Sequence, residues 1–130
     1  MGGLSNHREL IAWQQAVSLV ELVYRETAIF PKQETYGLAT QIRRSAVSIP
    51  ANIAEGAGRN SVKELIQFLG IASGSKAELD THLEIAHRLG MIRTDSPVFS
   101  QLERVGQLLT ALRKSLQNQL RPASIKSTND

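Results

Sequence analysis

The chain contains no cysteine. This absence excludes disulfide frameworks, zinc sites built from thiolates and cysteine nucleophiles. Aromatic residues are scarce at 5%, and the nine glycines are scattered. The β-branched residues never form the alternating runs that are typical of strands, so we expect no sheet. A composition that is 42% hydrophobic and 21% charged is ordinary for a folded globular domain and argues against the disordered and membrane classes.

Long hydrophobic runs are also missing. The first residues hold no apolar segment of signal-peptide length, and Asn6 stands where a myristoylation signal needs Ser or Thr. No apolar run approaches the roughly 20 residues that span a bilayer. We therefore expect a cytoplasmic protein that does not associate with membranes. The length favours one domain over residues 1–120.

The net charge of +3 and the pI near 9.6 indicate an acidic partner only weakly. The positive surplus falls in loops, in the last residues and in two of the predicted helices described next, 34–56 and 97–120. The bias is modest and lacks the basic arm of a dedicated DNA-binding protein.

The remaining sequence predicts four helices, over residues 7–29, 34–56, 61–89 and 97–120, followed by a disordered tail over 121–130. Short loops between helices of similar length favour an all-α, up-down antiparallel four-helix bundle. Each helix has an apolar stripe at helical spacing: Trp13, Ala16, Val17, Val20 and Tyr24, widened by Leu19, Leu22 and Val23; Leu38, Ile42, Ala46, Ile49 and Ile53; Leu65, Phe68, Leu69, Ala72, Leu79, Leu83 and Ala86; Val98, Leu102, Val105, Leu109, Leu112 and Leu116.

Local signals set the helix ends. Ser61 and Glu64 form a capping box at the start of the third helix, and Gly90 is placed to end it. Ser96 followed by a proline is a favoured start for the fourth helix. Pro50 falls inside the second helix, where it removes a backbone donor, so we expect a kink or a break there.

The second predicted helix also has a polar face opposite its apolar stripe. This face consists of Gln41, Arg44, Ser48, Asn52, Glu55 and Arg59, with Arg43 at its margin. One interpretation is a solvated face with an internal Glu55–Arg59 ion pair. The other is a specific contact surface for a subunit or a nucleic acid, where the planar guanidinium of arginine is favoured over lysine.

Catalytic and metal chemistry find little support. Glu84 and His87 match one Glu-x-x-His element, but di-iron bundles need that element on two helices. No nucleophile and base stand out as a pair. We expect no enzyme activity, no metal, no cofactor and no small-molecule substrate. The small residues Gly70, Ser73, Gly74 and Ser75 are read as a place where another helix packs closely, and Trp13 and Tyr24 as core residues.

The string from Tyr36 to Gly56, YGLATQIRRSAVSIPANIAEG, closely resembles the signature of the bacterial four-helix-bundle family also called the 23S ribosomal RNA intervening-sequence proteins. Other segments are similar to the same family: AWQ at 12–14, Phe30-Pro31, and FLGIASGS at 68–75. The resemblance covers about residues 10–116. Ser45 and Lys76 depart from the residues that the family usually has, and Lys76 puts in doubt part of the packing surface of the third helix.

The resemblance implies a four-helix bundle that assembles into a ring-shaped homopentamer. It also implies no enzyme activity, and a relation to the accessory protein of diversity-generating retroelements, which binds nucleic acid and a reverse transcriptase. By match to the motif, Arg43, Arg44 and Arg59 are the expected contact residues, with Asn52 and Glu55 in support. The broad apolar surface of helix 7–29 and the small residues of helix 61–89 are candidate subunit contacts.

Two hypotheses for function follow. The first is a non-enzymatic oligomeric module that binds structured RNA or a nucleoprotein partner through basic faces. The alternative is a protein–protein scaffold with no specific nucleic-acid role, in which the second helix serves assembly.

Overall fold

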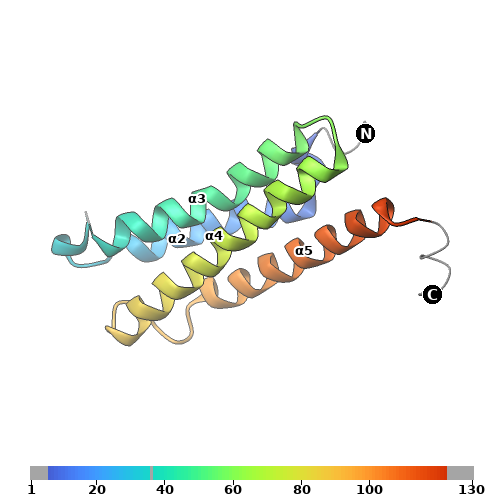
Figure 1. Ribbon diagram of the computed structural model, residues 1–130. Coiled ribbons are helices and arrows are strands. Elements are labelled where there is room, and N and C mark those ends of the chain that lie inside the picture. The colour runs from blue at the N-terminus through green and yellow to red at the C-terminus, as the bar shows by residue number, and fades with distance from the viewer. Residues whose placement is uncertain (1–5, 36, 123–130) are drawn as a thin grey trace.

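The structure is a computed structural model that describes residues 6–35 and 37–122. Its helices are Ile11–Thr27 (α2), Leu38–Ala57 (α3), Val62–Arg88 (α4) and Pro97–Leu120 (α5). Two 3-10 turns, His7–Glu9 (η1) and Lys32–Glu34 (η2), precede α2 and α3 (Figure 1). Over the described ranges there is no strand, which confirms the all-α prediction with four helices.

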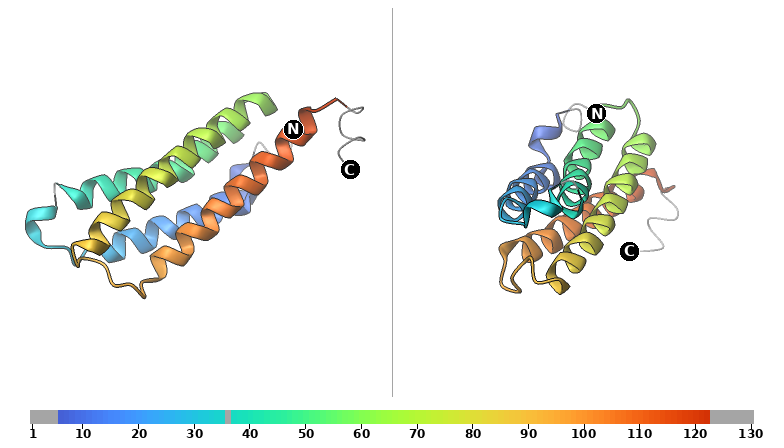
Figure 2. Two further views of the ribbon diagram at one scale, coloured as in Figure 1. Left: turned by 60° about the horizontal axis from the view of Figure 1, so that its bottom comes forward. Right: turned by 90° about the vertical axis from the view of Figure 1, so that its left-hand side faces the viewer.

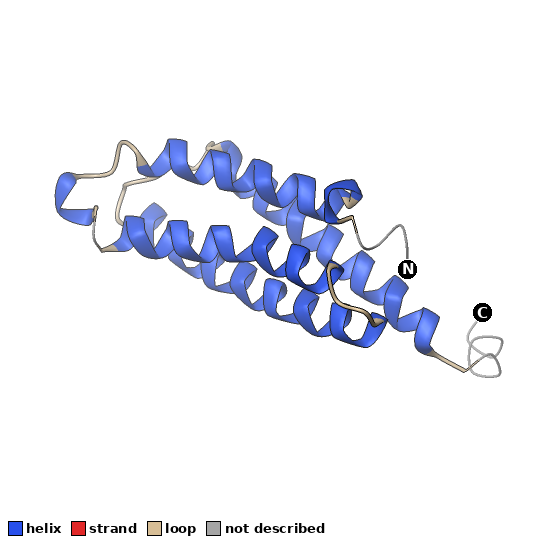
Figure 3. Ribbon diagram, turned by 90° about the horizontal axis from the view of Figure 1, so that it is seen from above, coloured by secondary structure: helices blue, strands red, loops and turns tan. Residues whose placement is uncertain are grey.

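The helices run alternately up and down and pack in a cycle. Each contacts its neighbours in the order α2, α3, α4, α5 and back to α2. The pairs α2–α4 and α3–α5 therefore lie on the diagonals, as the end-on view in Figure 2 shows. Short loops connect the helices at both ends of the bundle (Figure 3). No helix in the described part of the chain is long and apolar enough to cross a membrane.

The core confirms three of the four predicted stripes. Ile42, Ala46, Ile49 and Ile53 of α3 are completely buried, and the stripes of α4 and α5 are buried apart from half-exposed Phe68 and Leu112. The predicted stripe of α2 is confirmed in part: Ala16, Leu19 and Val23 are completely buried, but Tyr24 is not in the core. The buried residues of α2 are Ala12, Ala16, Leu19, Val23 and Thr27, whereas Tyr24 is 45% exposed. Two neighbouring rows of side chains on this helix share the helical period. The sequence pattern favoured the row ending at Tyr24, because the row that is actually buried contains the small Ala12 and the polar Thr27.

The helix ends match most of the local signals. The Ser61 hydroxyl accepts a hydrogen bond from the Glu64 backbone N–H at 3.1 Å, and the Ser96 hydroxyl accepts one from Val98 N–H at 3.2 Å. Gly90 has φ of 77°, a left-handed conformation that glycine adopts without strain. Met91 N–H then reaches back to the carbonyl of Ala86 at 2.9 Å, which completes the helix C-cap.

The first two helices begin later than predicted. Residues 7–9 form η1, and the extended Leu10 separates it from α2, which ends at Thr27. Likewise η2 and Gly37 precede α3. Gly37 has φ of −106° and ψ of −111°, outside helical geometry, so α3 starts after it. Of the predicted tail, residues 121 and 122 follow α5, and 123–130 lie outside the described residues.

Helix α3 continues through Pro50 without a break, contrary to one of the two expected outcomes. Pro50 is buried, and the residues around it keep helical hydrogen bonding. The Asn52 side-chain amide donates to the Ser48 carbonyl at 2.8 Å and to the Ser48 hydroxyl at 3.0 Å. Asn52 therefore braces the turn that contains the proline.

Glycine sets how closely the helices approach each other. A Cβ on Gly56 would lie 2.7 Å from the Phe68 Cβ and 3.0 Å from a Leu65 methyl, so α3 and α4 meet with no room for a side chain. A Cβ on Gly106 would lie 2.9 Å from the Lys76 Cε, so this glycine makes room for the lysine that departs from the family pattern. Gly74, predicted to face another helix, has no atom within 4 Å of its would-be Cβ among the described residues.

This difference predicts opposite effects for two alanine substitutions within helices. Gly56→Ala is expected to lower the free energy of unfolding by about 1–3 kcal/mol, because the Phe68 Cβ is fixed to its backbone and cannot move aside cheaply. Gly74→Ala is expected to raise it by about 0.5–1 kcal/mol, because alanine restricts the unfolded chain and meets nothing in the folded one. Urea denaturation followed by circular dichroism measures both. A loss of stability in Gly74→Ala would mean that another subunit covers this position.

Candidate nucleic-acid or partner interface on α3

The five predicted site residues do not form one cluster. Arg43 and Arg44 lie in the N-terminal half of α3, whereas Glu55 is near its C-terminus and Arg59 lies just beyond it. Eleven residues separate Arg44 from Glu55, which corresponds to about 16 Å along the helix. Asn52 lies between the two groups and faces α4. The structure therefore divides the predicted site into two places with different surroundings.

Arg43 is anchored to α2. Its Nε donates to the Thr27 hydroxyl at 2.8 Å, and its guanidinium lies 4.9 Å from the centre of the Tyr24 ring. Thr27 is buried and donates in turn to the Val23 carbonyl at 2.8 Å. The guanidinium is thus held in a defined orientation over an exposed aromatic ring, a cation–π contact worth about 0.5–1 kcal/mol at such a site.

Arg44 is exposed and points outward from the bundle. It shares a shallow groove of about 470 Å³ with Tyr24, Thr40, Arg43, Val47 and Ser48. Val47 is 43% exposed, so the groove combines two guanidinium groups with apolar surface. Neither arginine takes part in the ion pairs found among the described residues. This groove, which we call the α2–α3 arginine groove, therefore has positive charge without a neighbouring acidic partner.

Arg59 has a different environment. Its guanidinium lies 3.0 Å from a Glu55 carboxylate oxygen and 3.8 Å from one of Glu64, and 4.9 Å from the centre of the Phe68 ring. Two carboxylates neutralise this arginine, and the ring fixes its position. The predicted Glu55–Arg59 ion pair is confirmed. These contacts join the end of α3 to the start of α4. Arg59 therefore stabilises the turn between the two helices, and its charge is already paired.

The predicted polar face is partly an internal seam. The Ser48 and Ser75 hydroxyls are hydrogen-bonded to each other at 2.7 Å between α3 and α4.

The buried Ser45 donates to the carbonyls of Gln41 and Ile42 at 3.1 Å, and its hydroxyl lies 3.4 Å from His82 Nδ1. Ser48, Asn52 and Ser75 therefore hold two helices together, and of the predicted face Arg44 and Gln41 remain exposed without such a role.

Metal and acid–base chemistry are not supported where the structure describes the chain. No group of three His, Asp or Glu side chains in its described ranges is arranged to hold a metal ion. Glu84 pairs with Arg88 at 2.7 Å instead of with His87, whose Nε2 is hydrogen-bonded to Thr94 at 2.9 Å. The hydrogen bond from Arg88 lowers the pKa of Glu84, and the one from Arg93 lowers the pKa of Asp95. Both are surface ion pairs near the α4–α5 turn, away from the arginine groove.

Tyr24 is the residue that the sequence interpretation misplaced. It was expected in the core, but it is exposed and lies under the Arg43 guanidinium. The contact joins positions that are far apart along the chain, so no local pattern announces it. The one sequence feature that could have indicated its exposure is its position as the last residue of the predicted stripe.

Together, the fold and this groove define an all-helical bundle protein with two adjacent arginines, Arg43 and Arg44, on its α2–α3 surface. The chain belongs to the family described as 23S rRNA-intervening sequence protein, which matches residues 8–111. This match confirms the family resemblance drawn from the α3 sequence.

A solved structure gives a second comparison. The chain is similar to a protein from Bacteroides thetaiotaomicron VPI-5482 that is described as a protein of unknown function from the S23 ribosomal protein family. The two share 25% sequence identity with a TM-score of 0.61, over 86% of this chain and 100% of that chain. Comparison with curated proteins gives no match.

The surroundings of the two adjacent arginines predict different effects on stability. Arg43→Ala is expected to lower the free energy of unfolding at pH 7 by about 1–2 kcal/mol, because it removes a hydrogen bond to a buried hydroxyl and a cation–π contact. Arg44→Ala is expected to change it by less than about 0.5 kcal/mol, because its side chain is exposed. Urea denaturation compares them, with Arg104→Ala as the control for loss of one exposed positive charge. Equal losses in both variants would contradict the anchoring role of Arg43.

Proposed function

We propose that this protein is a non-enzymatic, oligomeric binding module that contacts structured RNA, or a nucleoprotein containing it, through basic surfaces. The observation that carries the proposal is the pair Arg43 and Arg44 in the α2–α3 arginine groove, with no acidic partner among the described residues. Guanidinium groups bind phosphate oxygens through paired hydrogen bonds. The family description, which refers to 23S rRNA, supports RNA as the polyanion.

The geometry favours Arg43 and Arg44 over Arg59 as contact residues. The cation–π contact with Tyr24 holds Arg43 in place before any ligand arrives, which lowers the entropic cost of binding. Arg44 is exposed beside it and can reach a second phosphate. We assign Arg59, Glu55 and Asn52 to the support of α3, because their polar groups are already paired within the chain.

Assembly is part of the proposal. One subunit with two open arginines in a groove binds nucleic acid weakly at physiological salt, because each phosphate contact contributes little by itself. A ring of subunits, with the homopentamer favoured by the family resemblance, repeats the groove around an axis and gains avidity without new contacts in each subunit. Exposed apolar residues on α4 and at its C-cap, Ile71 at 51%, Ile85 at 43% and Leu89 at 65%, provide surface that assembly can bury. We propose a cytoplasmic location for this assembly.

The same apolar residues support the second candidate, a protein–protein scaffold. In that case the α3–α4 surface binds copies of the chain or a protein partner, and positive charge is incidental. Arg44 then serves assembly. Light scattering on the purified protein, with and without total cellular RNA at 50 and 300 mM KCl, separates the candidates. A particle of about five subunits that gains mass with RNA at low salt alone supports the RNA-binding module. A particle indifferent to RNA at both salt concentrations supports the scaffold.

The assignment of Arg44 is tested by titrating a fluorescein-labelled RNA hairpin with protein and measuring anisotropy over a series of KCl concentrations. Arg44→Ala is expected to weaken binding about five- to tenfold at 0.1 M KCl and to reduce the salt slope by about 0.9 per contact removed, because one phosphate contact is lost. Arg59→Ala is expected to bind as the unmodified protein does.

Arg104→Ala serves as the matched control, since it removes one exposed positive charge from a different helix. If Arg104→Ala weakens binding as much as Arg44→Ala, the effect is one of general charge, and the assignment to the groove is wrong. If Arg44→Ala instead dissociates the oligomer, the scaffold candidate is favoured.

A further inference from the structure

The second half of α5 has positive charge and no acidic residue. From residue 104 to residue 122 the chain contains Arg104, Arg113, Lys114 and Arg121 and neither Asp nor Glu. In the described ranges these four residues make none of the ion pairs, which involve Arg25, Arg59, Lys76, Arg88 and Arg93. This local surplus is larger than that of the α2–α3 arginine groove, and the function proposed above does not use it.

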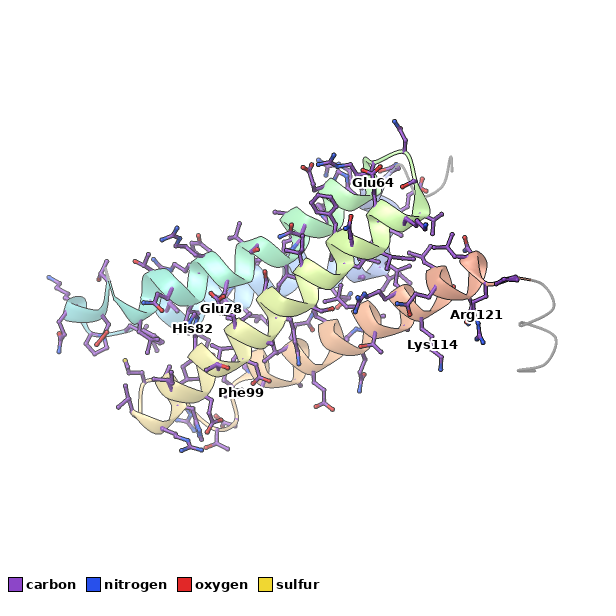
Figure 4. All side chains as sticks on the ribbon, in the orientation of Figure 1. Glu64, Glu78, His82, Phe99, Lys114 and Arg121 are labelled. Atoms are coloured by element: carbon purple, nitrogen blue, oxygen red, sulfur yellow. The ribbon has the colours of Figure 1, made fainter. Side chains whose placement is uncertain are left out.

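Three of the four residues lie along the same flank of α5. Lys114 and Arg121 are seven residues apart, so they project from nearly the same side of the helix, as Figure 4 shows. Arg113 lies next to Lys114 on the side that faces α4, where its guanidinium lies 3.2 Å from the position of a would-be Cβ on Gly70. We call Arg113, Lys114 and Arg121 the α5 cation row. Arg104 projects from the side of α5 opposite to Arg113, because nine residues at 100° each place the two 180° apart; it lies about 80° from Lys114 around the helix and about 15 Å from it along the axis.

Arg113 is incompletely satisfied. Its Nε is buried and has no hydrogen-bond partner in the part of the chain that the structure describes. A buried donor without a partner costs about 1–3 kcal/mol, and because protein atoms cover this Nε, the terminal nitrogens of Arg113 are the atoms that a ligand could reach. The missing Cβ of Gly70 is what gives the guanidinium its position against α4.

The surface beside the row is open. A shallow groove of about 500 Å³ runs between α4 and α5, lined by Ser73, Lys76, Glu103, Gly106, Gln107, Leu109, Thr110 and Ala111, with its one acid, Glu103, at the end farther from the row. Gly74 beside it meets no atom within 4 Å of its would-be Cβ. The antiparallel register, set by Gly70 beside Arg113 and Gly106 beside Lys76, brings Lys63 level with the end of α5. Lys63 and the α5 cation row therefore place positive charge at one end of this groove.

We propose that the α5 cation row is a second phosphate-binding track, which takes the sugar-phosphate backbone of a nucleic-acid strand along the α4–α5 groove. The proposal rests on the proposed function for the class of ligand, and it assigns a separate surface. Lys114 and Arg121 are about 10 Å apart along the helix. That separation exceeds the size of one phosphate, so the row fits a polymer of phosphates better than a single anion.

The track lies away from the arginine groove. Helices α3 and α5 are on a diagonal of the bundle, and the N-terminal half of α3, which contains Arg44, lies at the end of the bundle opposite to the C-terminal half of α5 (Figure 1). The two sites are therefore separable by mutation.

The test uses the double variant Lys114→Ala/Arg121→Ala, whose side chains are exposed and leave the core unchanged. The probe is a fluorescein-labelled single-stranded RNA of about 20 nucleotides, measured by anisotropy over a KCl series. The double variant is expected to bind roughly 20-fold more weakly at 0.1 M KCl, with the salt slope reduced by about 1.4, because two single-strand phosphate contacts are lost. Arg104→Ala, about 15 Å from Lys114 along the helix and on the side opposite to Arg113, is expected to bind as the unmodified protein does. Arg113→Lys retains the charge and is expected to lose less affinity than Arg113→Ala.

Each outcome decides a particular claim. If the double variant binds RNA as the unmodified protein does while Arg44→Ala does not, the α5 track is wrong and the proposed function stands. If the double variant alone is impaired, the track is supported and the assignment of Arg44 is wrong. If the unmodified protein binds no RNA at 50 mM KCl, both proposals fail.

Two further probes test the ligand class. A DNA strand of the same sequence is expected to bind within a few-fold of the RNA, because the row contacts phosphates; a large preference for RNA would show that bases or 2′-hydroxyls are read instead. Poly-glutamate of similar length is expected to compete poorly. Equal competition by poly-glutamate would overturn the phosphate assignment in favour of an acidic protein segment.

Discussion

The close contact between α3 and α4 is the constraint on which the rest of the structure depends. Gly56 allows the two helices to meet at one end, and the Ser48–Ser75 hydrogen bond joins them near the middle. Asn52 reinforces the same seam from within α3, around the buried Pro50. Because these small and polar residues occupy the seam, the long side chains of α3 are directed to its two other sides. The seam thus determines which arginines are exposed.

Neighbouring acids decide what each arginine can do. Arg59 is between two carboxylates and above Phe68, so its charge is neutralised and its side chain fastens a turn. Arg43 is fixed by neutral groups, a hydroxyl and an aromatic ring, and retains its positive charge. Fixing a cation without neutralising it prepares it for an anion, since little side-chain entropy is left to lose on binding. The same residue type therefore has a structural role at one end of α3 and, in the proposed function, a binding role at the other.

The sequence predicted the helices because their apolar periodicity and capping residues are local properties. Ser61, Gly90 and Ser96 all act where the pattern placed them. The candidate site was harder to predict from the sequence, because the surroundings of its side chains depend on contacts between segments that are distant along the chain. The spacing of Arg44 and Arg59 indicates one polar face, but it does not report that Glu64 of the next helix neutralises the second arginine. Nor could periodicity distinguish the two apolar rows of α2, and so Tyr24 was assigned to the core instead of to the surface beneath Arg43.

The placement of basic residues has a consequence for how such a small protein could bind a large polyanion. Net charge of +3 on one chain gives little long-range attraction. The charge is divided, however, between the α2–α3 arginine groove and the α5 cation row, at different ends and on different faces of the bundle. In the proposed function, one subunit would contact separate segments of RNA, and a symmetric assembly would multiply both sets. Linking weak sites in this way raises affinity through effective concentration, but only for ligands long or folded enough to reach several sites. Preference for structured RNA over short fragments would therefore follow from geometry, without readout of any base.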